Sequence, residues 1–279
     1  FLAFVAASLS LFPLIGRDFF PTVDAGLIKL HVRSPPGTRI EQNEERFARI
    51  EDTIRGVIPK KEIRTMLDII GTPYSGLNLS LSEGALISPA DGQVLVALKE
   101  HHGSTPEYVR KLRKQLTHDF PGTTFFFIAP DISTQVLNFG QAAPIDVQVV
   151  GPTGEEARTY SRAEKRRDRI ARIPGAVDVH LAQVVDRPQR YFYVNRTMAS
   201  QLGLTAQDVS SDLLISLASS GQVSPGFWID PKRGVQYLVA VQTPQYAINS
   251  IDALSSTPIA RTNGGPELLS HVATISRST

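Results

Sequence analysis

The chain has 279 residues, with 29 Lys and Arg against 27 Asp and Glu, and it contains no cysteine. The length suffices for two or three domains with real cores. The net charge of +2, with basic and acidic residues interleaved, gives no electrostatic footprint for nucleic acid, and the absence of cysteine excludes disulfides and thiolate chemistry. These features favour a globular protein that does not bind nucleic acid.

An uncharged apolar run opens the chain, from Phe1 to Gly16. Crossing the hydrocarbon core as a helix takes about 20 apolar residues, and this run supplies roughly three-quarters of them before Arg17. No basic stretch precedes the run and no small-residue cleavage site follows it, so it is unlike a signal peptide. We therefore expect the chain to be a fragment whose residues 1–16 are the end of a transmembrane helix. The alternative is a buried helix of a soluble protein.

Two strand–helix–strand units follow. Alternating and β-forming residues predict strands at 27–32, 63–70, 93–98 and 123–130, and apolar residues at helical spacing predict helices at 39–57 and from 105 to about 119. A Gly/Ser/Pro-rich stretch from Gly71 to Asp91 separates the second and third strands. Loops of this length inside a compact domain are usually binding loops or lids, or are disordered.

A third unit of the same kind covers residues 145–181, with strands predicted at 145–150 and 177–181 around a helix at 155–173. Its helix ends at Ile-Pro-Gly, as the preceding one ends at Phe-Pro-Gly. The repeat predicts an α+β fold of ferredoxin-like split βαβ layers, in which helices cover one face of a mixed sheet.

Beyond Asp186 the strand–helix–strand repeat ends and the predicted elements are shorter. Strands are predicted at 191–195, 225–230, 234–242, 257–260 and 272–275, and helices at 197–202, 205–217 and 251–254. Thr205 is placed to cap the second of these helices.

Sequence motifs for catalysis are lacking. There is no Gly-x-Ser-x-Gly nucleophile elbow, and the Gly-rich segment at 71–76 lacks the Lys-Ser/Thr of a phosphate-binding loop. The adjacent His101 and His102 have no third ligand at helical or hairpin spacing, which favours an exposed loop over a metal site. We therefore predict no enzyme activity, no catalytic residue, no metal site and no cofactor.

The most distinctive apolar segment is Thr124-Phe-Phe-Phe-Ile128. The period of two in a strand places Phe125 and Phe127 on one face and Phe126 and Ile128 on the other, so both faces must meet apolar surroundings. One face can be core while the other lines a pocket; the alternative is that both are core.

Several stretches together resemble the resistance-nodulation-division (RND) efflux pumps, in the drug (hydrophobe/amphiphile, acriflavine-resistance-like) branch. They are, in order, GRDFFPTVDAGLIKLHVRSPPGT, IDVQVVGPTGEEA, IPGAVDV, VNRTMASQLGLTAQDVSSDL and PIARTNGGPELLSHVATIS. The resemblance covers the whole chain and implies the second large periplasmic loop, which follows the seventh membrane helix.

This resemblance implies a domain organisation and an assembly. Residues 17–135 would be the first porter subdomain of the C-terminal half, 136–185 with 246–279 the second, and 186–245 an inserted docking subdomain. The pump would be a homotrimer in the bacterial inner membrane, with this region mostly in the periplasm, and would work with a periplasmic adaptor protein and an outer-membrane duct. Proton antiport would drive it through relay residues outside this chain.

The resemblance also implies substrate-binding residues. In the family, substrate is contacted by the strand that lines the deep drug pocket, by the loop after that strand, by its return strand and by the strand beside the access pocket. The residues at these positions here are Leu67, Ile69, Thr72, Tyr74, Leu95, Phe125 and Phe127. Family members often carry Phe at several of these positions, whereas Leu67, Thr72 and Leu95 are not aromatic, and the loop at 71–91 is longer than in the drug pumps.

The expected function is therefore multidrug efflux with a role in antibiotic resistance, through noncovalent capture of amphiphilic small molecules. Two alternatives remain open. One is a heavy-metal-exporting RND pump, against which we note that Met66 and Met198 are the only thioethers and lie in different predicted subdomains. The other is a membrane-anchored periplasmic binding module with a ferredoxin-like fold.

Overall fold

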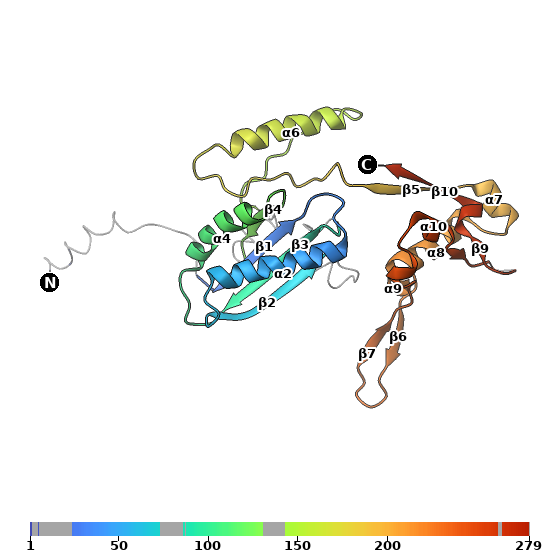
Figure 1. Cartoon of the computed structure of the whole chain (residues 1–279), viewed down its shortest axis with the longest axis horizontal. Coiled ribbons are helices and arrows are strands. Elements are labelled where there is room, and N and C mark those ends of the chain that lie inside the picture. The colour runs from blue at the N-terminus through green and yellow to red at the C-terminus, as the bar shows by residue number, and fades with distance from the viewer. Residues whose placement is uncertain are drawn as a thin grey trace.

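The computed structural model describes residues 24–72, 86, 88–130, 143–261 and 264–278, together with Phe1 and Val5 (Figure 1). Most of the predicted membrane segment at 1–16, most of the loop at 71–91, and Tyr74 with it, lie outside the described residues. Within the described part of the chain, none of the helices combines the length and the apolar character that a membrane span requires.

The first part of the chain forms a four-stranded antiparallel sheet with two helices. Its elements are β1 (Leu27–Arg33), α2 (Ile40–Val57), β2 (Ile63–Ile70), β3 (Asp91–Leu98), α4 (Thr105–Asp119) and β4 (Thr124–Ile128). The strand order β2-β3-β1-β4 is that of the predicted split βαβ arrangement, but all three strand pairs are antiparallel, so the predicted mixed sheet is wrong. The α+β fold class is thus confirmed, and all six elements lie where their apolar periodicity predicts them.

One face of this sheet packs against α2 and α4. Its centre consists of Leu30 and Val32 from β1 with Val94 and Val96 from β3, all of them buried, and the helices add fully buried side chains such as Phe47. Strand β3 passes so close to α2 that a Cβ on Gly92 would lie 2.3 Å from the ring of Phe47 and 2.8 Å from the carbonyl oxygen of Ile69. A glycine is therefore required there for helix and sheet to meet.

Between β4 and residue 188, the described residues form one regular element, the predicted helix α6 (Glu156–Ile170). The strands predicted at 145–150 and 177–181 are wrong, because within the described chain neither segment is paired in a sheet. In the first of them, Ile145 is 78% and Val150 87% exposed. A strand depends on a neighbour for its hydrogen bonds, so β-forming residues alone do not produce one.

Residues 189–278 form a second body. Its elements are β5 (Gln189–Val194), α7 (Arg196–Gln201), α8 (Ala206–Ala218), α9 (Ser220–Val223), β6 (Gly226–Ile229), β7 (Gln236–Val239), the 3-10 turn η2 (Gln245–Ala247), α10 (Ile251–Ser255), β8 (Pro258–Ile259), β9 (Glu267–Leu268), α11 (Leu269–Val272) and β10 (Ala273–Ser278). Thr205 caps α8 through a reciprocal capping box with Asp208, as predicted.

Two stretches of this second body that the resemblance assigns to different subdomains pack against each other. Strand β10 pairs with β5, and Ile259, Leu269 and Val272 share one buried cluster with Ala199 and Val209. Strand β10 and the side chains of Ile259, Leu269 and Val272, which the resemblance places in one subdomain with 136–185, therefore pack with residues 189–218. Strand pairing and a shared core decide this grouping.

Candidate functional site: the second face of the sheet

The sheet face opposite α2 and α4, here called the second face, carries three of the seven predicted site residues. Two rows of directly opposed residues cross all four strands from β2 to β4. One row consists of Ile69, Gln93, His31 and Phe126, and the other of Leu67, Leu95, Lys29 and Ile128.

The structure brings three of the predicted substrate-binding residues together on this face. Leu67 stands directly opposite Leu95, and Ile69 lies two residues along β2 on the same side. Leu67 is 57% exposed, whereas Ile69 and Leu95 are half-buried. These three form an apolar patch toward the β2 edge of the sheet.

Thr72 lies apart from that patch. It is exposed just after β2 and lines an open groove of about 820 Å³, whose other walls are residues 37–41, 88–90 and 187–190. The structure therefore places Thr72 beside the chain that enters β5, while Tyr74 lies outside the described residues.

Phe125 and Phe127 point to the opposite side of the sheet from Leu67. Phe125 stands opposite Val32, is only 8% exposed and belongs to the core under the helices. Phe127 stands opposite Leu30, packs on the same core and has the guanidinium of Arg113 5.1 Å from its ring centroid. Phe125 and Phe127 therefore belong to the core face of β4; on β4 the second face belongs to Phe126 and Ile128.

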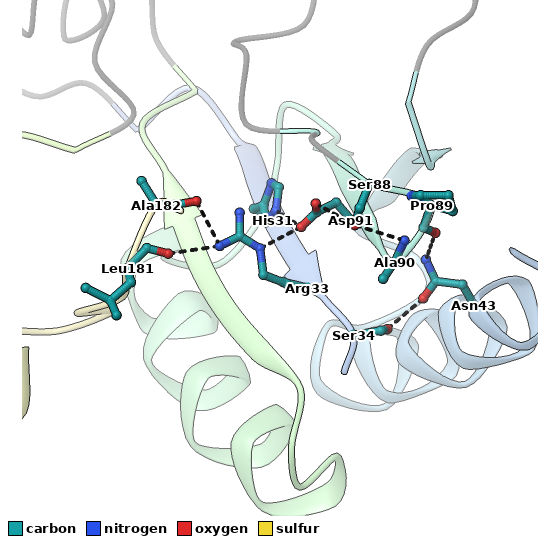
Figure 2. Close-up of polar contacts among 10 residues, drawn as sticks. All are labelled: His31, Arg33, Ser34, Asn43, Ser88, Pro89, Ala90, Asp91, Leu181 and Ala182. Carbon is teal, nitrogen blue, oxygen red and sulfur yellow. Dashed lines mark hydrogen bonds and ion pairs between the residues drawn. The ribbon is translucent and has the colours of Figure 1, made fainter. Parts of the chain in front are cut away.

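A buried polar cluster that the sequence analysis missed lies where the central strands β1 and β3 meet on the second face (Figure 2). Asp91 Oδ1 accepts a hydrogen bond from Arg33 Nε at 2.7 Å and lies 3.2 Å from His31 Nε2, while Ser88 donates to Asp91 Oδ2 at 3.0 Å. His31 and Asp91 are fully buried. The alternation in β1 places His31 and Arg33 on one face, which was the available signal, but their partner comes from 58 residues further along the chain.

The electrostatics of the cluster follow from burial and pairing. Burial raises the pKa of Asp91, but the hydrogen bonds from His31 and Arg33 and the charge of Arg33 outweigh it and bring the pKa to about 2. Burial lowers the pKa of His31 below its ordinary value, against the opposing effect of Asp91. His31 is therefore neutral and donates from Nε2, and its Nδ1 has no hydrogen-bond partner among the described residues.

Close to this cluster, the loop before β3 is tied to α2. Ser34 donates to Asn43 Oδ1 at 2.6 Å, and Asn43 Nδ2 donates to the carbonyl oxygen of Pro89 at 3.0 Å (Figure 2). The end of the long loop is thus held in place directly before Asp91.

The second face also receives the segment that follows α6. The ring of Phe126 is stacked between His31, with centroids 4.2 Å apart, and His180, with centroids 3.7 Å apart. Next to this stack lies a cavity of about 360 Å³, lined by Arg33, Ser34 and Ser88 on one side and by Tyr160, Arg167 and residues 179–187 on the other. In the ranges that the structure describes, no three His, Asp or Glu side chains are grouped so as to hold a metal ion.

The chain is similar to a known protein family and to proteins of known function. A family model described as the AcrB/AcrD/AcrF family matches residues 1–279. The cobalt-zinc-cadmium resistance protein CzcA of Cupriavidus metallidurans is 25% identical over 94% of this chain and 24% of its own length, and Protein HelA of Legionella pneumophila is 24% identical over 77% of this chain and 20% of its own length.

Solved structures agree in fold. A heavy metal efflux pump in one crystal form superimposes with a TM-score of 0.64 and 25% identity, over 99% of this chain and 27% of that one. A second crystal form gives a TM-score of 0.66 at 24% identity, over 99% of this chain and 28% of that one. The chain spans about a quarter of the length of these relatives.

Proposed function

Because the chain belongs to the AcrB/AcrD/AcrF family of resistance-nodulation-division efflux pumps, we propose that it forms part of the substrate-handling region of a pump that exports heavy-metal cations. The observation that carries this proposal is the similarity to the cobalt-zinc-cadmium resistance protein over 94% of the chain. The expected drug-branch function has less support than this alternative, since the relatives reported above include metal-resistance proteins.

The second face gives this proposal physical support. A pocket for amphiphiles is lined mainly by apolar and aromatic side chains, yet the middle of this face carries the buried polar side chains of His31 and Gln93. Imidazole and oxygen ligands suit zinc, nickel and cobalt, whereas clustered thioethers suit copper(I). The scarcity of methionine therefore argues only against a soft monovalent substrate.

The remaining features of the pump follow as parts of the same proposal. The protein would act by noncovalent transport without enzymatic chemistry, as a homotrimer in the inner membrane with this region in the periplasm. It would use proton flow and pass its substrate through an adaptor protein to an outer-membrane duct.

Amphiphile export remains a second candidate because of one observation, the exposed apolar patch formed by Leu67, Ile69 and Leu95. Such a patch suits non-directional contacts with amphiphilic molecules.

Resistance profiles of the full-length pump distinguish the two. Expressed in a host that lacks its own RND pumps, it is expected to raise the growth-inhibitory concentrations of zinc, cobalt, nickel or cadmium salts and to lower cellular metal content, with dyes and detergents unaffected. Cells with the empty vector are the control. Protection against dyes and detergents without any protection against metals would reverse the assignment.

A further inference from the structure

An acidic side chain interrupts the apolar row with which β2 faces α2. Met66, Asp68 and Ile70 alternate along this strand on the side of the core, and Met66 and Ile70 pack against the core cluster. Across the sheet, Asp68 stands directly opposite Val94 of β3, which is fully buried. The carboxyl group of Asp68 therefore has apolar neighbours both along its own strand and on the next one.

The charged groups that face Asp68 come from α2. Glu51 lies within hydrogen-bonding reach of the Asp68 carboxyl group, and Arg55 acts on it through its charge. Arg55 itself is engaged with two other carboxylates, since Nη2 lies 2.5 Å from Glu51 Oε2 and Nη1 lies 3.3 Å from Asp52 Oδ1. Strand β3, by contrast, presents glycine and valine on this side. One guanidinium thus serves Glu51 and Asp52, while Asp68 lies beside Glu51.

Asp68 and Glu51 are poorly placed to be ionised together. The Oδ1 atom of Asp68 is inaccessible to water and has no hydrogen-bond partner among the described residues, and the side chain of Glu51 is only 21% exposed. Two adjacent carboxylates repel each other, whereas one proton between them turns the contact into a charge-assisted hydrogen bond. Burial and the neighbouring Glu51 raise the pKa of Asp68 to about 7, against the opposing charge of Arg55.

The ion pair with Arg55 decides which of the two carboxyl groups carries the proton. Because Arg55 stabilises Glu51 as a carboxylate, the proton resides on Asp68, which donates a hydrogen bond to Glu51. We propose that Asp68 and Glu51 form a proton-binding site between β2 and α2, which holds one proton between the two carboxyl groups and releases it as the pH rises.

The proton-binding site lies directly behind the apolar patch of the second face. Leu67 and Ile69, the neighbours of Asp68 in the sequence, point to that face and belong to the patch. Strand β2 is an edge strand that pairs only with β3 in the described sheet, so its contact with α2 helps to hold it. Release of the proton leaves two like charges in this contact and weakens it. An effect on substrate handling rests on the proposed function, whereas the proton-binding site does not.

The sign of the pH dependence follows from the two states of the chain. The pKa of Asp68 is about 7 in the folded protein and has its ordinary value of 3.8 in the unfolded one, so the folded protein binds more protons between these values. The stabilisation of β2 is therefore complete below about pH 4 and is lost as the pH rises through 7.

Hydrogen–deuterium exchange of the full-length protein, followed by mass spectrometry, tests the site. The quantity measured is the protection factor of peptides that cover β2, at pH 5.5 and at pH 8, after correction for the intrinsic exchange rate at each pH. Asp68→Asn keeps the shape and can donate to Glu51 at either pH, and Glu51→Gln removes the neighbouring charge. Asp52→Asn is the matched control, because Asp52 pairs with the same Arg55 but is 80% exposed.

In the unsubstituted protein, the protection factor of β2 is expected to fall roughly tenfold from pH 5.5 to pH 8. In Asp68→Asn it should stay within about twofold, because this side chain cannot lose a proton, and in Glu51→Gln the fall should be smaller than in the unsubstituted protein. Asp52→Asn is expected to follow the unsubstituted protein.

Three results would overturn the site: no fall in the unsubstituted protein, the same fall in Asp68→Asn with circular dichroism showing a folded protein, or loss of the fall in Asp52→Asn. Metal resistance at the two pH values is scored separately. A pump without metal activity can therefore still show the proton-binding site, and a metal pump can lack it.

Discussion

Asp91 is the side chain on which the polar cluster of the second face depends. It is fully buried, and it is stabilised as a carboxylate by His31, Arg33 and Ser88. A buried charge of this kind is tolerated only when hydrogen bonds and opposite charges compensate it. Protonation of Asp91 should therefore lower the stability of the whole subdomain.

This leads to a prediction for the acid side of the stability profile. The pKa of Asp91 is about 2 in the folded protein, below its ordinary value of 3.8, so its stabilising effect is complete above about pH 4 and is lost as the pH falls toward 2. The shift corresponds to about 2 kcal/mol. Urea unfolding of the protein at several pH values is expected to show this loss, and Asp91→Asn is expected to lack it while being less stable at pH 6. Parallel profiles for the two proteins below pH 4 would contradict the assignment.

At the scale of elements, the contact between α2 and β3 defines how the helices sit on the sheet. Gly92 allows the ring of Phe47 to approach the strand, while Gly56, on the exposed side of α2, has nothing within 4 Å of the position of a Cβ. The two glycines therefore provide a matched pair with opposite expectations.

Gly92→Ala is expected to lower the free energy of unfolding by about 1–3 kcal/mol, because the new methyl group collides with Phe47 and with backbone. Gly56→Ala is expected to raise it by up to about 1 kcal/mol through helix propensity. Both are measured by urea unfolding. A tolerated methyl group at residue 92 would mean that helix and sheet are further apart than described.

The segment around α6 shows that a helix can form without a neighbouring segment, whereas a strand cannot. Helix α6 forms because its hydrogen bonds are internal to the segment, although it has no buried residue. The flanking β-forming stretches at 145–150 and 177–181 need a partner strand, and within the described residues neither is paired in a sheet.

At the scale of the whole molecule, the distinction between core and substrate-contact residues has a functional consequence. In the full-length pump, Phe125→Ala is expected to cost about 3–5 kcal/mol of stability, because it leaves a cavity under the helices. Resistance to every substrate should then fall in step with the amount of pump in the membrane. Leu67→Ala removes a side chain that is 57% exposed, so the amount of pump should stay the same while resistance changes for some substrates only.

Resistance panels normalised to pump abundance by immunoblot check this prediction. A selective change in substrate range from Phe125→Ala, at normal abundance, would return Phe125 to the substrate pocket. An identical loss across all substrates from Leu67→Ala would remove Leu67 from it.

The amino-acid sequence by itself determined the six elements of the first sheet subdomain, the cap of α8 and the family. Apolar periodicity located β1, α2, β2, β3, α4 and β4, the Thr205 cap identified the start of α8, and five ordered stretches identified an efflux pump. These features depend on spacing within one segment, or on the order of segments, and both can be read along the chain.

Only the tertiary structure decided what meets on the second face. His31, Asp91 and His180 come together from three distant segments, and β10 pairs with β5 across about 80 residues. Which face of β4 belongs to the core was decided in the same way, since alternation separates Phe125 from Phe126 but does not say where the helices lie. Contacts between distant segments depend on how the elements pack, and the residue pattern within one segment does not specify that packing.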